Sequence, residues 1–290
     1  MRDEAKAVAV LLKERFDRMT RAERQLSNAI LGNYPLSGLG SITALADSAD
    51  VSAATVARLV QKLGFKGFPE FQASLRSEVE VKLENPIARR ATWVESASEK
   101  HVLNRFTETV IGNIDRSLAQ IDPVTFDAAA ALLADRNRKI LIAGGRITGE
   151  LADYLSLHLQ VIRAGVTRVG TVSNSWPEYL LDTAPGDVVV VYDVRRYEVA
   201  TLRLAEVAHQ RGAEIILLTD QWQSPIGKLA NHAFNCHISV PSAWDSNVPL
   251  MLLTEIFIAA VQDSNWEQSK KRLEGLEEMF ERTPFFRKLS

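Results

Sequence analysis

The stretch KILIAGGRITGELA, residues 139–152, determines the fold expected for most of the chain. An apolar run leads into Gly144-Gly145, and a helix-like pattern begins after this pair. A strand, a glycine turn and a helix in this order are typical of a loop that binds an anion through backbone N–H groups. Such loops favour small residues, but here Arg146 stands inside the turn. The stretch therefore predicts a strand–turn–helix unit with a guanidinium group at the anion-binding position.

Further apolar runs follow towards the C-terminus, rich in β-branched residues. They are VTRVGT, DVVVVYD, EIILLTD and AFNCHISV, and helix-like segments at 147–163 and 197–211 separate most of them. Runs that are apolar at nearly every position suit a parallel sheet covered on both faces. Closing helices are expected at 247–262 and 265–282. The pattern predicts a doubly wound α/β domain with a parallel sheet.

Residues 1 to about 80 instead have an all-helical pattern. Within SITALADSADVSAATVARLVQKLGF, residues 41–65, two short helices are expected, with Ser41 and Ser52 as their N-caps. Gly64 is placed to end the second helix. The residues expected on the buried face of that helix are Val56, Leu59, Val60 and Leu63.

The opposite face of this second helix is polar and basic. The expected DNA-binding residues are Ser52, Ala53, Thr55, Arg58, Gln61, Lys62 and Lys66. A small tip lets a helix enter a major groove, where polar side chains reach base edges and phosphates. Residues 51–76 hold four basic residues and one acidic residue, a net charge of +3 that suits phosphate attraction. The pattern is typical of a helix-turn-helix DNA-binding domain, although a helical hairpin with a basic solvated face has the same spacing.

Composition limits the other classes of function. The net charge of the whole chain is −2, so it offers no general attraction to nucleic acid or to an anionic membrane. A single cysteine, Cys236, excludes an internal disulfide framework and is expected to be buried, and the nearby His232 and His237 are only a weak metal signal. No apolar run approaches the roughly 18 residues of a membrane span. We expect a soluble cytoplasmic protein without cofactor or metal.

The domain limits follow from a change in pattern. Asn85-Pro86 breaks any helix, and the periodicity stays weak up to a helix expected near 103–121. We expect a helix-turn-helix domain at 1–82, a linker at 83–105, and an α/β domain at 106–290 for effector binding and oligomerisation.

Two segments resemble one known family. Residues 20–80 resemble the helix-turn-helix domain of the RpiR family of bacterial transcriptional regulators, most closely in VSAATVARLVQKLGFKGFPEF. Residues 110–262 resemble the sugar isomerase (SIS) domain of that family, on ILIAGGRITGELA, DVVVVYD and LLTDQWQSPIGKLA. The resemblance implies a DNA-binding regulator, repressor or activator, whose SIS-like domain senses a phosphosugar.

The sequence departs from the phosphate-binding pattern of that family. Arg146 stands where a second glycine is usual, and Thr148 replaces the usual serine. In the loop DVRRYEVAT at 193–201, Asp193 and Arg195 stand where serines are expected, and Arg196 where glycine is expected.

These departures define the expected effector site. Its residues are Gly144, Gly145, Arg146, Thr148, Arg195, Arg196 and Ser224, at the carboxyl ends of strands, where open α/β sheets bind ligands. Arginine makes bidentate hydrogen bonds to carboxylate and phosphate, so we expect a small anionic effector such as a sugar phosphate or a sugar acid. The alternative is that one or more arginines form structural salt bridges with Asp193, Asp220 or Glu150.

Two other functions remain open at the level of sequence. A sugar-phosphate isomerase would need a general base, for which Glu150, Glu178 and His158 are candidates, with His158 expected to be packed inside. No catalytic triad or metal constellation stands out, and a DNA-binding module is hard to explain in a plain enzyme, so we expect no enzyme. A scaffold protein with a vestigial site is the third reading.

The expected assembly is a homodimer or a higher even oligomer on near-palindromic operator DNA, because one helix-turn-helix reads few base pairs. VPLMLLTEIFIAAV at 248–261 is a candidate interface helix, unless it covers the sheet.

Overall fold

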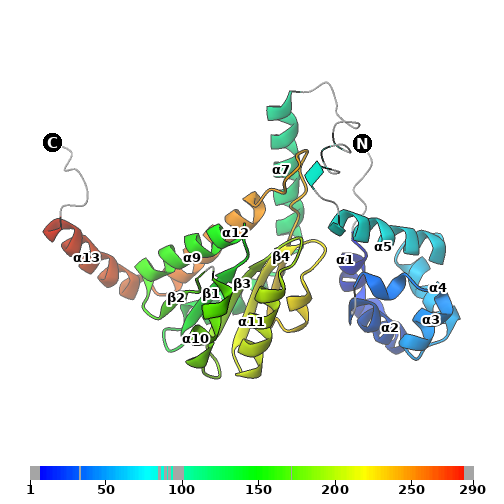
Figure 1. Cartoon of the computed structure of the whole chain (residues 1–290), viewed down its shortest axis with the longest axis horizontal. Coiled ribbons are helices and arrows are strands. Elements are labelled where there is room, and N and C mark those ends of the chain that lie inside the picture. The colour runs from blue at the N-terminus through cyan, green and yellow to red at the C-terminus, as the bar shows by residue number, and fades with distance from the viewer. Residues whose placement is uncertain are drawn as a thin grey trace. The chain divides into compact units, whose positions relative to one another are not determined.

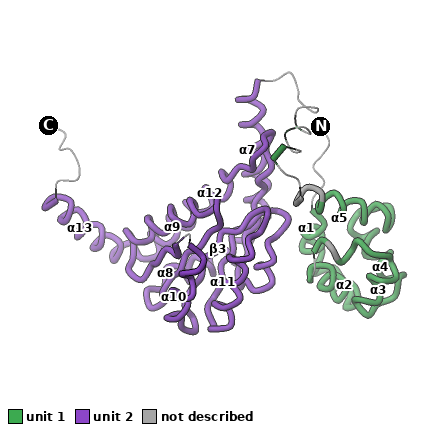
Figure 2. The backbone as a smooth tube through the Cα atoms, in the orientation of Figure 1, with its two compact units in different colours: residues 1–96 green, residues 97–290 purple. Residues whose placement is uncertain are grey.

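The chain divides into two compact units, residues 1–96 and residues 97–290 (Figure 2). The computed structural model describes residues 7–32, 34–83, 86, 87, 90, 93, 101–170 and 172–283. Most of the expected linker at 83–105 lies outside the described residues. Helix α5 (Phe68–Leu83) ends at the first residue of this range, and helix α7 (Val102–Ala119) begins inside it, at Val102.

Unit 1 is helical in its described part, as expected. Besides α5 it contains α1 (Val8–Glu14), α2 (Arg21–Gly32), α3 (Ile42–Ser48) and α4 (Ala53–Lys62), with 3-10 turns at Phe16–Arg18 and Leu36–Gly38 (Figure 1). Its core includes Leu12, Leu26, Ile30, Leu45, Leu59 and Phe71. Val56, Leu59, Val60 and Leu63 are all buried, which confirms the expected inner face of α4.

The ends of α3 and α4 follow the local sequence. Ser41 Oγ accepts the Ala44 N–H at 3.1 Å, and Ser52 Oγ accepts the Thr55 N–H at 3.2 Å, so both N-caps are confirmed. Gly64 ends α4 at φ 98°, a conformation that costs glycine little. These signals fix where the two helices begin and end, and hence which side chains α4 exposes.

Unit 2 contains a five-stranded parallel sheet. Its strands are β1 (Ile140–Gly144), β2 (Val166–Arg168), β3 (Val188–Asp193), β4 (Glu214–Asp220) and β5 (His232–Cys236), in the order β2-β1-β3-β4-β5. All four pairings are parallel, and Gly144, the last residue of β1, pairs with Tyr192, one residue before the end of β3. The turns after β1 and β3 therefore meet at one edge. The predicted α/β class with a parallel sheet is confirmed.

Helices cover both faces of this sheet (Figure 1). They are α8 (Pro123–Ala134), α9 (Gly149–Ile162), α10 (Trp176–Leu181), α11 (Val199–Gln210) and α12 (Val248–Ser264), followed by α13 (Trp266–Arg282). Side chains of α10 and α11 share a buried cluster with alternate residues of β1, β3 and β4, whereas α9 packs on the other face with α12 and α8. None of the described helices is both long and apolar enough to span a membrane.

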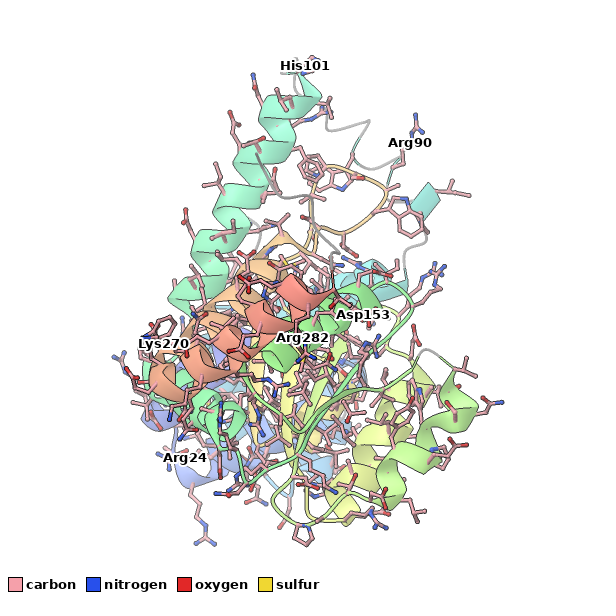
Figure 3. All side chains as sticks on the ribbon, turned by 90° about the vertical axis from the view of Figure 1, so that its left-hand side faces the viewer. Arg24, Arg90, His101, Asp153, Lys270 and Arg282 are labelled. Atoms are coloured by element: carbon pink, nitrogen blue, oxygen red, sulfur yellow. The ribbon has the colours of Figure 1, made fainter. Side chains whose placement is uncertain are left out.

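Helix α12 belongs to the core of unit 2. Leu250, Leu253, Phe257 and Val261 are buried, and the ring of Phe257 stacks on Phe126 of α8 with centroids 4.5 Å apart. The Phe257 ring also meets Phe234 of β5 edge to face, with centroids 5.2 Å apart, so 248–261 covers the sheet, which is one of its two expected roles. By contrast, Ser269 is the only buried residue of α13, and Figure 3 shows that helix with Lys270 and Arg282 labelled on it.

Candidate DNA-binding and effector sites

One face of α4 is exposed and lies opposite the core. Ala54, Arg58 and Gln61 are exposed at positions i, i+4 and i+7, so they share one side of the helix. The Arg58 guanidinium lies close to its own helix, with Nε donating to the Ala54 carbonyl oxygen at 3.3 Å. Ser52 is exposed at the tip of the helix, and Ala53 is half-buried. The face combines a small tip with one long cation and one amide.

Two residues expected on this face are held elsewhere. Thr55 is buried, and its hydroxyl lies 3.0 Å from Ser52 Oγ at the start of the same helix. Lys62 Nζ lies 2.8 Å from Glu23 Oε2, a salt bridge that ties α4 to α2. Lys66 is exposed beyond the end of the helix. The structure therefore corrects the expected exposed face: Arg58 and Gln61 stay on it, whereas Thr55 is buried and the Lys62 ammonium is paired with Glu23.

The glycine turn after β1 is tightly built. A Cβ on Gly144 would lie 2.6 Å from the Thr148 carbonyl oxygen, a backbone atom that cannot move aside. The Thr148 hydroxyl accepts the Gly145 N–H at 2.9 Å and donates its single proton to the Tyr192 carbonyl oxygen at 2.8 Å. Thr148 therefore joins the ends of β1 and β3, and its proton is used within the fold.

The second expected hydroxyl is used in a similar way. Ser224 Oγ donates to Asp193 Oδ2 and accepts the Ile226 N–H at 3.1 Å. Asp193 Oδ1 accepts the Thr201 hydroxyl and the Glu198 N–H, each at 3.3 Å. The loops after β3 and β4 are thus joined through one buried carboxylate.

Burial raises the pKa of Asp193 to about 6, although its hydrogen bonds from Ser224, Glu198 and Thr201 act in the opposite direction. Between pH 4 and pH 6 the folded chain therefore binds more protons at Asp193 than the unfolded chain does. Stability from this carboxyl is fully present below pH 4 and is lost as the pH rises through 6.

We expect Asp193→Asn to remove this dependence. The stability of the variant relative to the wild type should rise by on the order of 3 kcal/mol between pH 4 and pH 7. Urea unfolding of the full chain at several pH values measures the difference, with Asp115→Asn, an exposed carboxylate of α7, as the charge control. A difference that does not vary with pH would contradict the role assigned to Asp193.

Arg195 forms a buried salt bridge. Its Nε lies 2.6 Å from Asp245 Oδ2 and its Nη2 3.1 Å from Asp245 Oδ1, with side-chain exposures of 7% and 14%. Its guanidinium carbon also lies 4.1 Å from the centroid of the Trp222 ring. The expected alternative of a structural salt bridge is thus the arrangement observed, but with Asp245 rather than Asp193, Asp220 or Glu150.

Asp220 organises the backbone around this salt bridge. It is fully buried and accepts the Arg195 N–H at 2.6 Å, the Tyr197 hydroxyl at 2.7 Å and the Trp222 N–H at 2.9 Å. Burial, followed by the negative charge of Asp220, raises the pKa of Tyr197 well above its ordinary value. The tyrosine therefore stays protonated and donates to the carboxylate.

Backbone strain gathers at both candidate sites. Among the described residues, three that are not glycine have left-handed backbone: Asp50 at φ 49°, Arg196 at φ 56° and Gln223 at φ 62°. Asp50 lies between α3 and α4, and the other two lie in the loops after β3 and β4. Arg196 thus has the backbone conformation that the family's glycine would adopt easily. Non-glycine residues in this region cost about 1 kcal/mol or more and are enriched at functional sites.

Two arginines remain exposed at this edge, Arg146 and Arg196. The Arg146 N–H, by contrast, donates to Glu198 Oε1 at 2.7 Å. Sequence reasoning missed Glu198, Trp222 and Asp245. For Glu198 a signal was present, because an acidic residue lies in the very loop where the family pattern has small and hydroxyl residues. For Asp245 no local pattern indicates a partner 50 positions away.

The candidate residues for catalysis do not converge. Glu150, Glu178 and His158 are all exposed, on α9 and α10. His158 was expected to be packed, but it faces outward beside the Tyr154 ring, with centroids 4.4 Å apart, while Leu155 and Leu159 face inward.

Cys236 is buried as expected, and burial raises the pKa of its thiol to about 12. Within the described ranges, no cluster of three or more His, Cys, Asp or Glu is arranged to hold a metal ion.

Known proteins match both units. Residues 6–82 match the helix-turn-helix domain of the rpiR family, and residues 132–260 match the SIS domain. The HTH-type transcriptional regulator HexR of Pseudomonas aeruginosa is 26% identical over 258 residues, covering 87% of this chain and 85% of the relative.

Two solved structures are similar in fold. The Vibrio vulnificus NanR protein complexed with ManNAc-6P aligns with a TM-score of 0.57 at 17% identity, covering 97% of this chain and 99% of that one. The sugar isomerase domain of an RpiR transcription factor from Sphaerobacter thermophilus aligns with a TM-score of 0.56 at 21% identity, covering 62% and 99%.

The two units therefore define a helix-turn-helix protein with an attached SIS domain, and the two matched ranges together cover more than half of the chain. The chain belongs to the RpiR family of helix-turn-helix transcriptional regulators. Several curated relatives that it matches, HexR and RpiR among them, are named as HTH-type transcriptional regulators.

Proposed function

We propose that this regulator binds double-stranded operator DNA through the exposed face of α4 and responds to a small anionic metabolite at the carboxyl edge of its sheet. The observation that carries the proposal is the division of α4 into a buried face and an exposed face with Arg58 and Gln61 behind a small tip. An arginine and a glutamine are the side chains that pair bidentately with guanine and adenine in the major groove.

The anionic class of the effector follows from the side chains that stay exposed at the carboxyl edge of the sheet. Internal hydrogen bonds or salt bridges already occupy Arg195, Thr148 and Ser224. The side chains left to contact a ligand are the exposed Arg146 and Arg196. Two guanidinium groups in neighbouring loops favour a carboxylate or phosphate, hence a phosphosugar or a sugar acid. The similar NanR protein forms a complex with ManNAc-6P, and this complex supports the same class of effector here.

The assembly we propose is a homodimer or a higher even oligomer, acting in the cytoplasm on a near-palindromic operator. Two copies of α4 related by a two-fold axis would read two half-sites and double the number of contacts.

Arg146→Ala tests the effector site. We expect this variant to lose the response of operator binding to the effector while its operator affinity stays unchanged, because the two sites lie in different units. The measurement is fluorescence anisotropy of an operator duplex titrated with sugar phosphates and sugar acids. Coupling is reciprocal, so the duplex should shift effector affinity by the same factor.

The matched control is Arg203→Ala, which removes an exposed arginine of α11 that pairs with Glu206. It should respond as the wild type does. A full response in Arg146→Ala, or no response of the wild type to any anion, would refute the effector site.

A further inference from the structure

A carboxylate of the chain itself occupies the glycine turn after β1. Glu198 Oε1 accepts the Arg146 N–H at 2.7 Å across 52 positions of sequence. An ideal Cβ on Gly145 would lie 2.6 Å from this oxygen and 2.9 Å from the carboxyl carbon. The room that glycine leaves here is therefore filled by Glu198. Because Thr148 already accepts the Gly145 N–H, both N–H groups at the start of the turn are bound within the chain.

The backbone of Glu198 is held at the start of α11, whereas its side chain is joined to that backbone through rotatable bonds. Glu198 is the N-cap of α11, and its N–H donates to Asp193. Its side chain is half-buried and joined to that backbone by three rotatable bonds. The carboxylate is therefore able to swing off the turn without moving α11.

We propose that Glu198 is an internal competitor of the effector: its carboxylate holds the glycine turn until an anion displaces it. This inference rests on the proposed function, because it concerns the same anion site. The arriving carboxylate or phosphate accepts the Arg146 N–H in place of Glu198. It also contacts the exposed guanidinium groups of Arg146 and Arg196, which gives it interactions beyond the one that it replaces.

Competition of this kind sets the specificity of the site. The charge-assisted hydrogen bond of Glu198 must be broken before a ligand forms its own. The binding free energy from this position is therefore only the difference between the free energies of the two hydrogen bonds. A small anion that offers one contact gains little, whereas a ligand that reaches both arginines gains more. The site therefore discriminates against simple anions such as inorganic phosphate.

The test uses inorganic phosphate as the probe and Glu198→Gln as the main variant. Glutamine keeps the size of the side chain but removes its charge. We expect phosphate to bind Glu198→Gln about tenfold more tightly than it binds the wild type. Glu198→Ala should bind at least as tightly. Thermal melting of the full chain in increasing phosphate at constant ionic strength gives Kd for each variant. A ligand that binds only the folded state raises the free energy of unfolding by RT ln(1 + [L]/Kd).

The matched control is Glu150→Gln, which removes an exposed carboxylate from the first turn of α9 and should bind phosphate as the wild type does. Unchanged or weaker binding in both Glu198 variants, with binding lost in Arg146→Ala, would overturn the competitor and leave the anion site intact. An absence of binding in every variant would overturn both. Equal gains in Glu150→Gln and Glu198→Gln would reduce the effect to general charge repulsion and also overturn the competitor.

Discussion

Arg195→Ala is expected to destabilise unit 2 by about 3–5 kcal/mol, because removal of one partner leaves a buried charge without compensation. Asp245 would lose both hydrogen bonds from the guanidinium and would stay mostly buried. The Trp222 ring would lose the cation that lies over it. Urea unfolding of the full chain, followed by Trp fluorescence, measures the loss.

Two further variants distinguish a structural role of Arg195 from a ligand-binding role. Arg195→Lys keeps the charge but not the planar fork, so it should recover only part of the stability. Arg146→Ala removes an exposed arginine of the same edge and should change stability by less than about 0.5 kcal/mol. Stability of Arg195→Ala equal to that of the wild type, together with a lost effector response, would make Arg195 a ligand residue instead.

The strands and the helix ends could be predicted because their causes are local. Val188–Asp193 is buried at every position, and such a run has few alternatives to a central parallel strand. Ser52 and Gly64 fix the ends of α4 through their own backbone and side-chain chemistry. Short-range rules therefore defined the fold class and the inner face of α4.

The contacts within the sites could not be predicted, because they join distant positions. Lys62 meets Glu23 across 39 positions, and Glu198 meets the glycine turn across 52. No periodicity encodes which carboxylate an arginine will meet, so the sequence left three arginines equivalent. The structure separates them, since Arg195 is bound in the fold while Arg146 and Arg196 are exposed.

Arg58→Ala is expected to weaken operator binding by about 1–3 kcal/mol for each α4 that reads DNA, hence by about 2–6 kcal/mol in a dimer on two half-sites. The side chain is exposed and makes only weak contacts with its own helix, so truncation should leave stability almost unchanged. Arg24→Ala is the matched control, because it removes an exposed arginine of the same unit from α2 (Figure 3). It should bind operator nearly as the wild type does.

The most direct measurement is fluorescence anisotropy at physiological salt, with a duplex selected from a random pool by the wild-type chain and a scrambled duplex of equal length. The wild type should prefer the selected duplex by about a thousandfold or more. Arg58→Ala should lose most of this preference, and Arg24→Ala should keep it. Equal binding of both duplexes by the wild type, or an unchanged preference in Arg58→Ala, would contradict DNA recognition by α4.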